Sequence, residues 1–246
     1  DSIEDKLEPS LNYTQYIENE NQFLTTDSYK ETEEFWLNLY KDYHNFFEMP
    51  ADKPRPPLRT YNANRIDITL EADKVNELKK VADKNKVSLI SLLIAAFEVY
   101  LYRITRQETI VVGLPAAGQS ITNMLTLVGH CVNLLPLKTK INGDSPFNDY
   151  LRKRKETLFD AFENQRYTFG TLIKKLNIPR DPSRIPLVPV AFNVDLGLTD
   201  GVEFKGLQME VDSNPRKYEN FEIFLNATSF NNSIILECTY NTDLYD

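Results

Sequence analysis

The chain has 246 residues, of which 41% are hydrophobic and 26% are charged, and its formal net charge is -8. This composition is typical of a folded globular protein and excludes an intrinsically disordered chain. The acidic balance without a basic stripe argues against nucleic-acid and anionic-membrane partners, and no apolar run reaches the ~18 residues of a membrane-spanning helix.

The first 70 residues are predicted to hold a lead-in, one helix, a linker and one strand. Residues 1–26 are polar, lack the basic and apolar regions of a signal peptide, and are predicted to be irregular. Asp27 begins a helix whose acidic first turns suit the positive end of the helix dipole. Four prolines in residues 50–57 remove hydrogen-bond donors and predict an extended linker. Residues 65–70 alternate in polarity and are predicted to form a strand.

Two helices and a buried strand are predicted next. Residues 73–85 place their apolar side chains on one helical face. Ser88 caps a more apolar helix that extends to about Ile104 and that we expect to be buried on nearly every side. Residues 109–114 form the short apolar run that is typical of a central strand, and residues 115–127 are predicted to form a loop.

The second half of the chain is predicted to be richer in strands. Residues 131–137 have the pattern of a strand, and Ser145 with Pro146 begins a long helix that continues to about Gln165. A short helix is then predicted, followed by four strands, at residues 168–176, 187–195, 203–210, 217–229 and 233–240. Helices interspersed with strands predict an α/β fold with a mixed β-sheet flanked by helices.

The residues alone indicate no self-contained catalytic or metal site. The two histidines are His44 and His130, whereas a metal site needs three or four closely spaced ligands. We expect His44 to be a surface or helix-capping residue and His130 to be structural. The sequence contains no glycine-rich phosphate loop and no nucleophile elbow. Cys131 and Cys238 are predicted to be buried free thiols in a reducing compartment, which favours a cytoplasmic protein.

Five stretches form a recognisable series in chain order. They are an aromatic entry motif, a tryptophan helix with a proline-rich turn, a Gly-x-x-Val-Asn strand, a Gln-x-x-Thr-Phe segment and an Arg-Asp-x-Ser-Arg-x-Pro-Leu turn, at residues 13–16, 35–56, 128–137, 164–169 and 180–187. Together they resemble the condensation domains of nonribosomal peptide synthetases. Thr168 stands where that family often has proline, and Gln119 where it often has arginine. These departures weaken an assignment of subtype and leave the resemblance to the family intact.

The resemblance implies a chloramphenicol acetyltransferase-like fold, in which two similar lobes enclose a tunnel. It also implies a reaction in which an amine attacks a thioester, with both substrates carried on phosphopantetheine arms. The family's catalytic motif, His-His-x-x-x-Asp-Gly, belongs to the first lobe, and this sequence has no adjacent histidines. We therefore expect residues 1–246 to be the C-terminal, acceptor-side lobe, without the N-terminal catalytic lobe or the family's final helix. Such a chain has no catalytic residue of its own and is predicted to be inactive alone.

The resemblance places four residues at the tunnel. Asn133 matches a strand residue that faces the tunnel, and its amide could bind substrate or the neighbouring lobe. The alternative is a strand-end asparagine that satisfies the backbone. Gly129 and Val132 belong to the same motif. Arg65 resembles a family arginine that pairs with the aspartate of the catalytic motif, and its alternative is a surface arginine.

A second set of motif residues lies in a turn bounded by prolines. Arg180, Asp181, Ser183 and Arg184 resemble the family's Arg-Asp-x-Ser-Arg pattern. We expect an arginine–aspartate pair that shapes this turn and leaves one arginine near the tunnel mouth. A structural role is the favoured interpretation of the four residues.

Three functions are open at this point. The first is the acceptor-side lobe of an amide-forming condensation domain, which is part of an acyltransferase-class enzyme. The second is a non-catalytic module that docks a carrier protein or the missing lobe. The third is a related cyclising or epimerising acyltransferase domain. The resemblance implies upstream and downstream peptidyl carrier proteins and an adjacent adenylation domain as partners, with no directly bound cofactor or metal beyond the carriers' phosphopantetheine arms.

Overall fold

A mixed sheet organises the molecule. The structure, a computed structural model, describes residues 10–43, 47–119, 121–197, 204–207, 209, 213–230 and 232–246. Within these residues, six strands lie in the order β1-β6-β5-β4-β2-β3. Their bounds are Ala63–Leu70 (β1), Thr109–Ala117 (β2), Val132–Lys140 (β3), Val190–Asp195 (β4), Ile223–Phe230 (β5) and Ser233–Asn241 (β6). β4 runs parallel to both β2 and β5, and the other neighbours are antiparallel. This arrangement, with the helices described next, confirms the predicted fold class.

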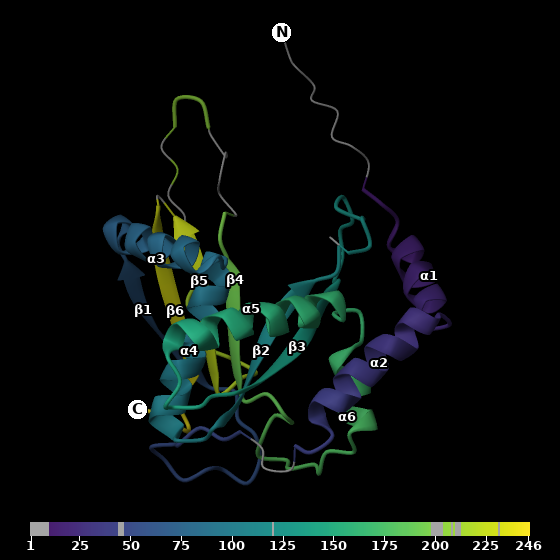
Figure 1. Cartoon of the computed structure of the whole chain (residues 1–246), viewed down its shortest axis with the longest axis horizontal. Helices are drawn as coiled ribbons and strands as arrows, with labels where there is room; N and C mark the ends of the chain where they lie inside the picture. Colours follow the sequence, from purple (N-terminus) through teal and green to yellow (C-terminus); the bar gives the residue numbers. More distant parts are fainter. Residues whose placement is uncertain are drawn as a thin grey trace.

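Helices cover one face of the sheet and flank its β3 edge (Figure 1). The helices α3, α4 and α5 contact one another and lie over the strands, whereas α6 packs beside β3 and α2 packs on α6. The helices span Tyr13–Phe23 (α1), Asp27–Tyr40 (α2), Ala72–Asn85 (α3), Leu89–Thr105 (α4), Phe147–Glu163 (α5) and Phe169–Lys175 (α6). In the described part of the chain, no single helix is long and apolar enough to cross a membrane, although α3 and α4 meet that test as a pair bent by 99°.

The core lies between the sheet and its helices. Ile110, Val111 and Val112 of β2 are each 0% exposed, because this strand has a neighbour on either side and packing on its faces. The prediction of a central strand is therefore confirmed. Ser88 caps α4 as expected, since its side chain accepts a hydrogen bond from the backbone N–H of Ser91.

Helix α4 is less buried than its sequence predicted. Tyr100 is 57% exposed and Ile104 is 40% exposed, so the expectation of burial on nearly every side is wrong. Glu98, by contrast, is 0% exposed and pairs with Arg154 of α5, Oε1 to Nη2, at 2.8 Å. Tyr150 donates a second bond to Glu98 at 2.7 Å. A buried charge is tolerated at this helix–helix contact because an opposite charge lies beside it and a hydroxyl donates to it.

Two predicted segments differ from the structure. The lead-in 1–26 was expected to be irregular, but residues 13–23 form α1, capped by the Asn12 side chain; residues 1–9 lie outside the described part of the chain. The helix has no buried residue, and its few aromatic side chains do not form the broad apolar face of a core helix. The strand expected at 217–229 begins only at Ile223. Where 203–210 was expected to be a strand, residues 204–207 form a turn, and residues 203, 208 and 210 lie outside the described part of the chain.

Candidate functional site

A cavity of about 350 Å³ opens beside the start of β3. Val132 and Asn133, two of the predicted tunnel residues, form part of its wall. The rest of the wall comes from α1, from the loop that joins β2 to β3, and from the turn between α5 and α6. The cavity thus brings together three segments that are far apart in the sequence, and each of them overlaps a stretch that was singled out as a motif.

Asn133 uses every hydrogen-bonding position of its side chain. Its Nδ2 donates to the backbone oxygens of Gln165 and Tyr167 at 2.7 and 2.8 Å. Its Oδ1 accepts from the backbone N–H groups of Leu134 and Phe169 at 2.9 and 3.1 Å. A side-chain amide has two donors and two lone pairs, so none is left over. This geometry favours the alternative in which Asn133 satisfies the backbone, here that of the α5–α6 turn, and a direct contact with substrate stays a prediction.

Two glycines allow segments to approach closely at the cavity. The backbone N–H of Gly118 donates to the carbonyl of Cys131 at 2.7 Å, and a Cβ on Gly118 would lie 2.7 Å from that oxygen. A Cβ on Gly129 would lie 2.5 Å from the ring of Tyr13, whose hydroxyl donates to the backbone oxygen of His130 at 2.8 Å. Gly129, predicted as a tunnel residue, therefore lies beside the cavity, where the loop meets α1.

Helix α1 contributes a charged pair to the cavity wall. The Arg166 guanidinium donates to the Glu20 carboxylate through Nη2 and Nε at 2.8 and 3.2 Å, and to the side-chain oxygen of Asn19 at 2.8 Å. The same guanidinium lies 3.8 Å from the centre of the Phe23 ring. Burial, followed by the nearby Glu20 carboxylate, raises the pKa of Tyr16 to about 12, so this phenol is protonated at neutral pH.

Sequence reasoning missed the α1 side of this site. Tyr16 and Arg166 belong to stretches that were noted as motifs, but nothing placed them together with Glu20. The reason is that residues 1–26 were expected to be irregular, and only a helix brings residues 16 and 20 onto one face.

Arg65 lies far from the other predicted tunnel residues. It is on β1, at the opposite edge of the sheet from β3. Its guanidinium approaches Asp67 at 2.8 Å and Glu237 at 3.5 Å, and it donates to Ser213 Oγ at 2.6 Å. The Arg65 side chain is 13% exposed. Arg65 is therefore partly buried, the structure does not bring it together with Asn133, and its pairing with the aspartate of the catalytic motif stays a prediction.

A row of polar side chains crosses the helix-free face of the sheet next to Arg65. Asp67, Glu237, Asn226 and Asn193 are in register across β1, β6, β5 and β4. Asn193 donates to Asn226 Oδ1 at 2.9 Å, and Asn226 donates to Glu237 Oε2 at 2.8 Å. Phe192 stacks on α4, and successive strand residues point to opposite faces, so this polar row lies away from the helices.

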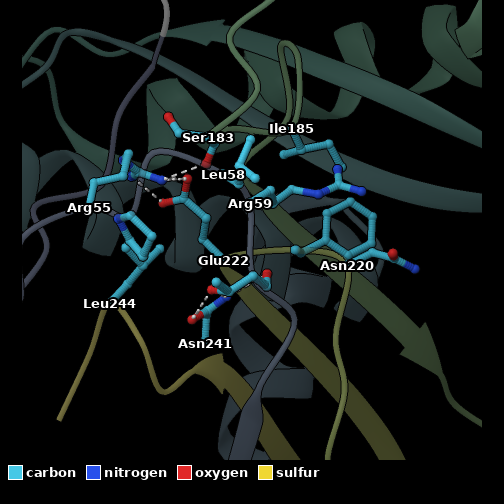
Figure 2. A pocket seen from close by; sticks show the side chains of 12 residues that line it. Arg55, Leu58, Arg59, Ser183, Ile185, Asn220, Glu222, Asn241 and Leu244 are labelled. Carbon is cyan, nitrogen blue, oxygen red and sulfur yellow. Dashed lines mark hydrogen bonds and ion pairs between the residues drawn. The ribbon is translucent and has the colours of Figure 1, made fainter.

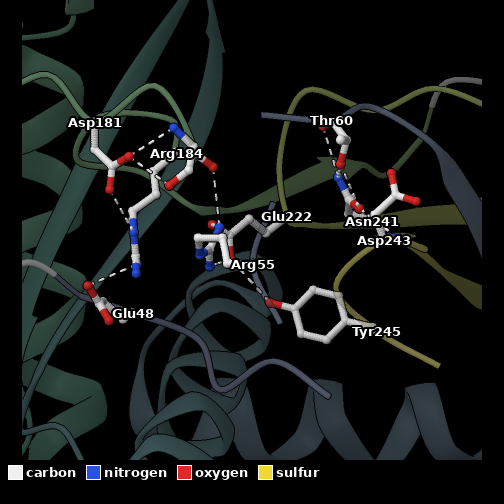
Figure 3. A network of polar contacts seen from close by, with 10 residues as sticks. Glu48, Arg55, Thr60, Asp181, Arg184, Glu222, Asn241, Asp243 and Tyr245 are labelled. Atoms are coloured by element: carbon white, nitrogen blue, oxygen red, sulfur yellow. Dashed lines mark hydrogen bonds and ion pairs between the residues drawn. The ribbon is translucent and has the colours of Figure 1, made fainter. Parts of the chain in front are cut away.

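The 180–184 turn has the arginine–aspartate pair that its sequence predicted (Figure 3). Arg184 Nε lies 3.2 Å from Asp181, and Arg184 Nη1 lies 2.8 Å from Glu48. Asp181 accepts from the backbone N–H and the hydroxyl of Ser183 at 2.8 and 2.7 Å. These bonds, and then the Arg184 charge, lower the pKa of Asp181. Arg180 is exposed, and the expected position of one arginine at the tunnel mouth stays a prediction.

A second arginine joins this turn to the ends of two other segments (Figure 2). Arg55 of the proline-rich linker donates to both Glu222 oxygens at 2.8 and 3.0 Å, and to the Ser183 carbonyl at 3.4 Å. Tyr245 donates to Glu222 at 3.2 Å. The hollow among these residues measures about 10 Å³, which is room for a single water molecule. The network is therefore structural and holds no ligand site.

The remaining groups of the described chain add no catalytic constellation. Residues 10–43, 47–119, 121–197 and the later described stretches contain no cluster of three metal-ligating side chains. Cys131 is buried and Cys238 is partly buried, and both are free thiols, so complete burial is confirmed for the first only. His130 lines the cavity. His44, predicted to be a surface or capping residue, lies outside the described residues.

Comparisons with known proteins match the whole chain to one family. The family model named "Condensation domain" matches residues 3–246. The chain is 33% identical over 240 residues to surfactin synthase subunit 1 of Bacillus subtilis, a match that covers 97% of this chain and 7% of that protein. It is 32% identical over 241 residues to bacitracin synthase 3 of Bacillus licheniformis, a match that covers 98% of this chain and 4% of that protein. The chain therefore spans a small fraction of these relatives.

Solved structures share the fold. The crystal structure of a four-domain nonribosomal peptide synthetase bound to AMP and glycine aligns with a TM-score of 0.84 at 21% identity, over 98% of this chain and 20% of that one. The condensation domain of the Monacolin K polyketide synthase MokA aligns with a TM-score of 0.84 at 16% identity, over 99% of this chain and 59% of that one. The X-domain from teicoplanin biosynthesis aligns with a TM-score of 0.83 at 20% identity, over 98% of this chain and 57% of that one.

Proposed function

The chain belongs to the condensation-domain family, and we propose that it is the acceptor-side lobe of an amide-forming condensation domain. In this proposal the cavity beside β3 is the acceptor side of the substrate tunnel. The observation that carries the proposal is that this cavity is built around Val132 and Asn133 of the Gly-x-x-Val-Asn strand, together with the α5–α6 turn that Asn133 holds.

Two further observations support a lobe that works against a second one. The chain aligns with only 59% of the MokA condensation domain, so a complete domain contains a second part of similar size. Large apolar side chains of the loop between β2 and β3, and of the first residue of β3, are exposed: Val128 is 80% exposed, Leu125 is 74% exposed and Val132 is 47% exposed. Exposed apolar surface of this kind marks a protein–protein contact, here with the proposed second lobe.

The proposed reaction joins an acyl thioester to an amine. The amine nitrogen attacks the thioester carbonyl, a C–N bond forms, the C–S bond breaks, and the amine proton leaves with the released thiol. A general base with a pKa near neutrality serves this step best. Tyr16 is protonated at neutral pH and Glu20 is paired with Arg166. We therefore propose that this chain shapes and orients the acceptor, and that the base comes from the His-His-x-x-x-Asp-Gly motif of the other lobe.

The proposed partners follow from the reaction. Both substrates would arrive on phosphopantetheine arms of upstream and downstream peptidyl carrier proteins, next to an adenylation domain, and the chain itself would bind no cofactor. The comparison with a four-domain synthetase bound to AMP and glycine supports such a setting. The proposed location is the cytoplasm, where thiols such as Cys131 and Cys238 stay reduced.

A non-catalytic docking module is the second candidate, and the same exposed apolar side chains favour it as well. The two candidates differ in what binding achieves. An acceptor-side lobe binds a second lobe and completes an enzyme, whereas a docking module binds a carrier protein without any reaction. Size-exclusion chromatography of the chain with an aminoacylated carrier protein, followed by analysis of the bound thioester, separates them.

The test of the proposed function is a single-turnover assay with two loaded carrier proteins. One carries an acyl thioester and the other an aminoacyl thioester, and mass spectrometry follows transfer of the acyl group. We expect no amide product above the carrier-only background when the chain is added alone. Amide formation by this chain alone would contradict the proposal, because it would mean that residues 1–246 contain the complete catalytic machinery.

A further inference from the structure

Helix α1 forms one wall of the cavity but is attached to the molecule by few contacts. None of its residues is buried. The side chains of α1 that contact distant segments recur at helical spacing and form a single stripe: Tyr13, Tyr16, Asn19, Glu20 and Phe23. Tyr16 and Glu20 of this stripe line the cavity. The wall is therefore held by a few specific contacts along one edge, and burial in the core contributes little.

Arg166 makes most of the polar contacts that hold the C-terminal half of α1. Its guanidinium bonds to Glu20 Oε1 and Asn19 Oδ1 at 2.8 Å each, and to the Asn19 backbone oxygen at 3.3 Å. It also lies 3.8 Å from the Phe23 ring centre, a cation–π distance. The ion pair is only partly exposed, with 22% of the Arg166 side chain and 26% of the Glu20 side chain accessible. Charge-assisted bonds that are partly shielded from water are the stronger kind.

The backbone on either side of Arg166 is itself held in place. Arg166 lies between Gln165 and Tyr167, whose backbone oxygens both accept hydrogen bonds from Asn133. The rigid β3 edge thus positions the turn, the turn positions the guanidinium, and the guanidinium positions α1. A contact that links a lightly attached helix to a rigid strand controls where that helix lies.

We propose that Arg166 is a positioning residue that holds α1 as the outer wall of the cavity and thereby sets the size of the group that the cavity admits. The consequence for the acceptor rests on the proposed function, whereas the position of the wall does not. Loss of the guanidinium lets α1 move outward about the connection at residues 24–26, which widens the cavity.

Cys131 reports the position of this wall. Cys131 belongs to the cavity lining and is 4% exposed. Its backbone oxygen accepts a hydrogen bond from Gly118, a residue that Tyr16 of α1 also approaches. Cys238 lies on β6, far from α1 along the sheet. The test measures thiol modification by an aromatic disulfide reagent under native conditions. A Cys238→Ser background reports on Cys131, and a Cys131→Ser background reports on Cys238.

We expect Arg166→Ala to accelerate modification of Cys131 about tenfold, because modification under native conditions follows the population of the opened state. The rate at Cys238 stays unchanged. Arg152→Ala is the matched control, since Arg152 pairs with Asp149 on the exposed surface of α5 and should leave both rates unchanged. The charge-swapped double variant Arg166→Glu with Glu20→Arg should bring the rate at Cys131 back toward that of the wild type.

Two results would overturn the proposal. An unchanged rate at Cys131 in Arg166→Ala would show that α1 is held without the guanidinium. Equal acceleration at Cys131 and Cys238 would show that Arg166 stabilises the whole fold and has no specific effect on the wall. Neither result depends on condensation activity. Amide formation by the wild-type chain alone would refute the proposed function, and a Cys131 thiol that alone becomes more reactive in Arg166→Ala would leave the positioning role of Arg166 standing.

Discussion

Replacement of Asn133 by aspartate tests whether this residue holds the α5–α6 turn or is available to substrate. The substitution keeps the shape of the side chain and its accepting oxygen. It replaces the donor that serves Gln165 and Tyr167 by an oxygen that faces their two carbonyl oxygens. A neutral hydrogen bond contributes about 1 kcal/mol net, and a buried carbonyl left without a donor costs about 1–3 kcal/mol. We expect Asn133→Asp to lower the free energy of unfolding by about 2–4 kcal/mol at neutral pH.

Urea unfolding followed by the fluorescence of Trp36 measures this loss. Trp36 is the single tryptophan of the chain, and its indole N–H donates to the backbone oxygen of Asn164, next to the turn. Asn76→Asp, at an exposed position of α3, is the matched control and should change the free energy of unfolding by less than about 0.5 kcal/mol.

The pH dependence provides a second, independent check. The carboxyl introduced by Asn133→Asp faces two carbonyl oxygens, so its pKa in the folded chain is raised above its unfolded value. The loss in free energy of unfolding is therefore fully present above that raised pKa. It shrinks as pH falls through the raised pKa, because the protonated carboxyl can donate a hydrogen bond again. Equal stability of Asn133→Asp and wild type at neutral pH would refute the structural interpretation and return Asn133 to the role of a substrate contact.

Two further predictions concern polar pairs away from the cavity. Arg154→Met should lower the free energy of unfolding, measured in urea, by about 3–5 kcal/mol, because Glu98 is left buried without its cation. Arg154→Met combined with Glu98→Leu should lower it by less than the single change, and a larger loss in the double variant would contradict this. The Tyr167 hydroxyl, followed by Lys175, lowers the pKa of Glu33, so this group stabilises the fold above pH 4.5 and loses its contribution as pH falls below that value. Glu33→Gln should therefore make the free energy of unfolding fall less steeply as pH drops below 4.5. An unchanged fall would be inconsistent with the Tyr167 hydrogen bond as the cause of the lowered pKa of Glu33.

The elements that the sequence predicted well are those whose burial leaves a pattern in the chain. β2 is apolar at nearly every position because it lies inside the sheet, and Ser88 precedes α4 with the side chain that a helix start requires. The arginine–aspartate pair of the 180–184 turn was also predictable, because its partners are three residues apart. Local signals of this kind need no knowledge of the rest of the fold.

The parts that the sequence did not predict depend on partners far away in the chain. Helix α1 buries no residue and is held by Arg166, which lies 146 positions from Glu20. Asn133 bonds to backbone groups 32 to 36 residues away, which the pattern of β3 alone could not indicate. Arg65 finds Glu237 only because β1 pairs with β6 at the edge of the sheet. In each case a long-range contact decided the role of the side chain.

The most direct test of the central claim is complementation of this chain by a second lobe. A separately produced polypeptide that carries the His-His-x-x-x-Asp-Gly motif of a related condensation domain is mixed with residues 1–246, and amide formation between two loaded carrier proteins is measured in a single turnover. We expect product from the mixture and none from either polypeptide alone. Product from residues 1–246 alone, or no product from a mixture that forms a stable complex, would contradict the assignment of this chain as the acceptor-side lobe.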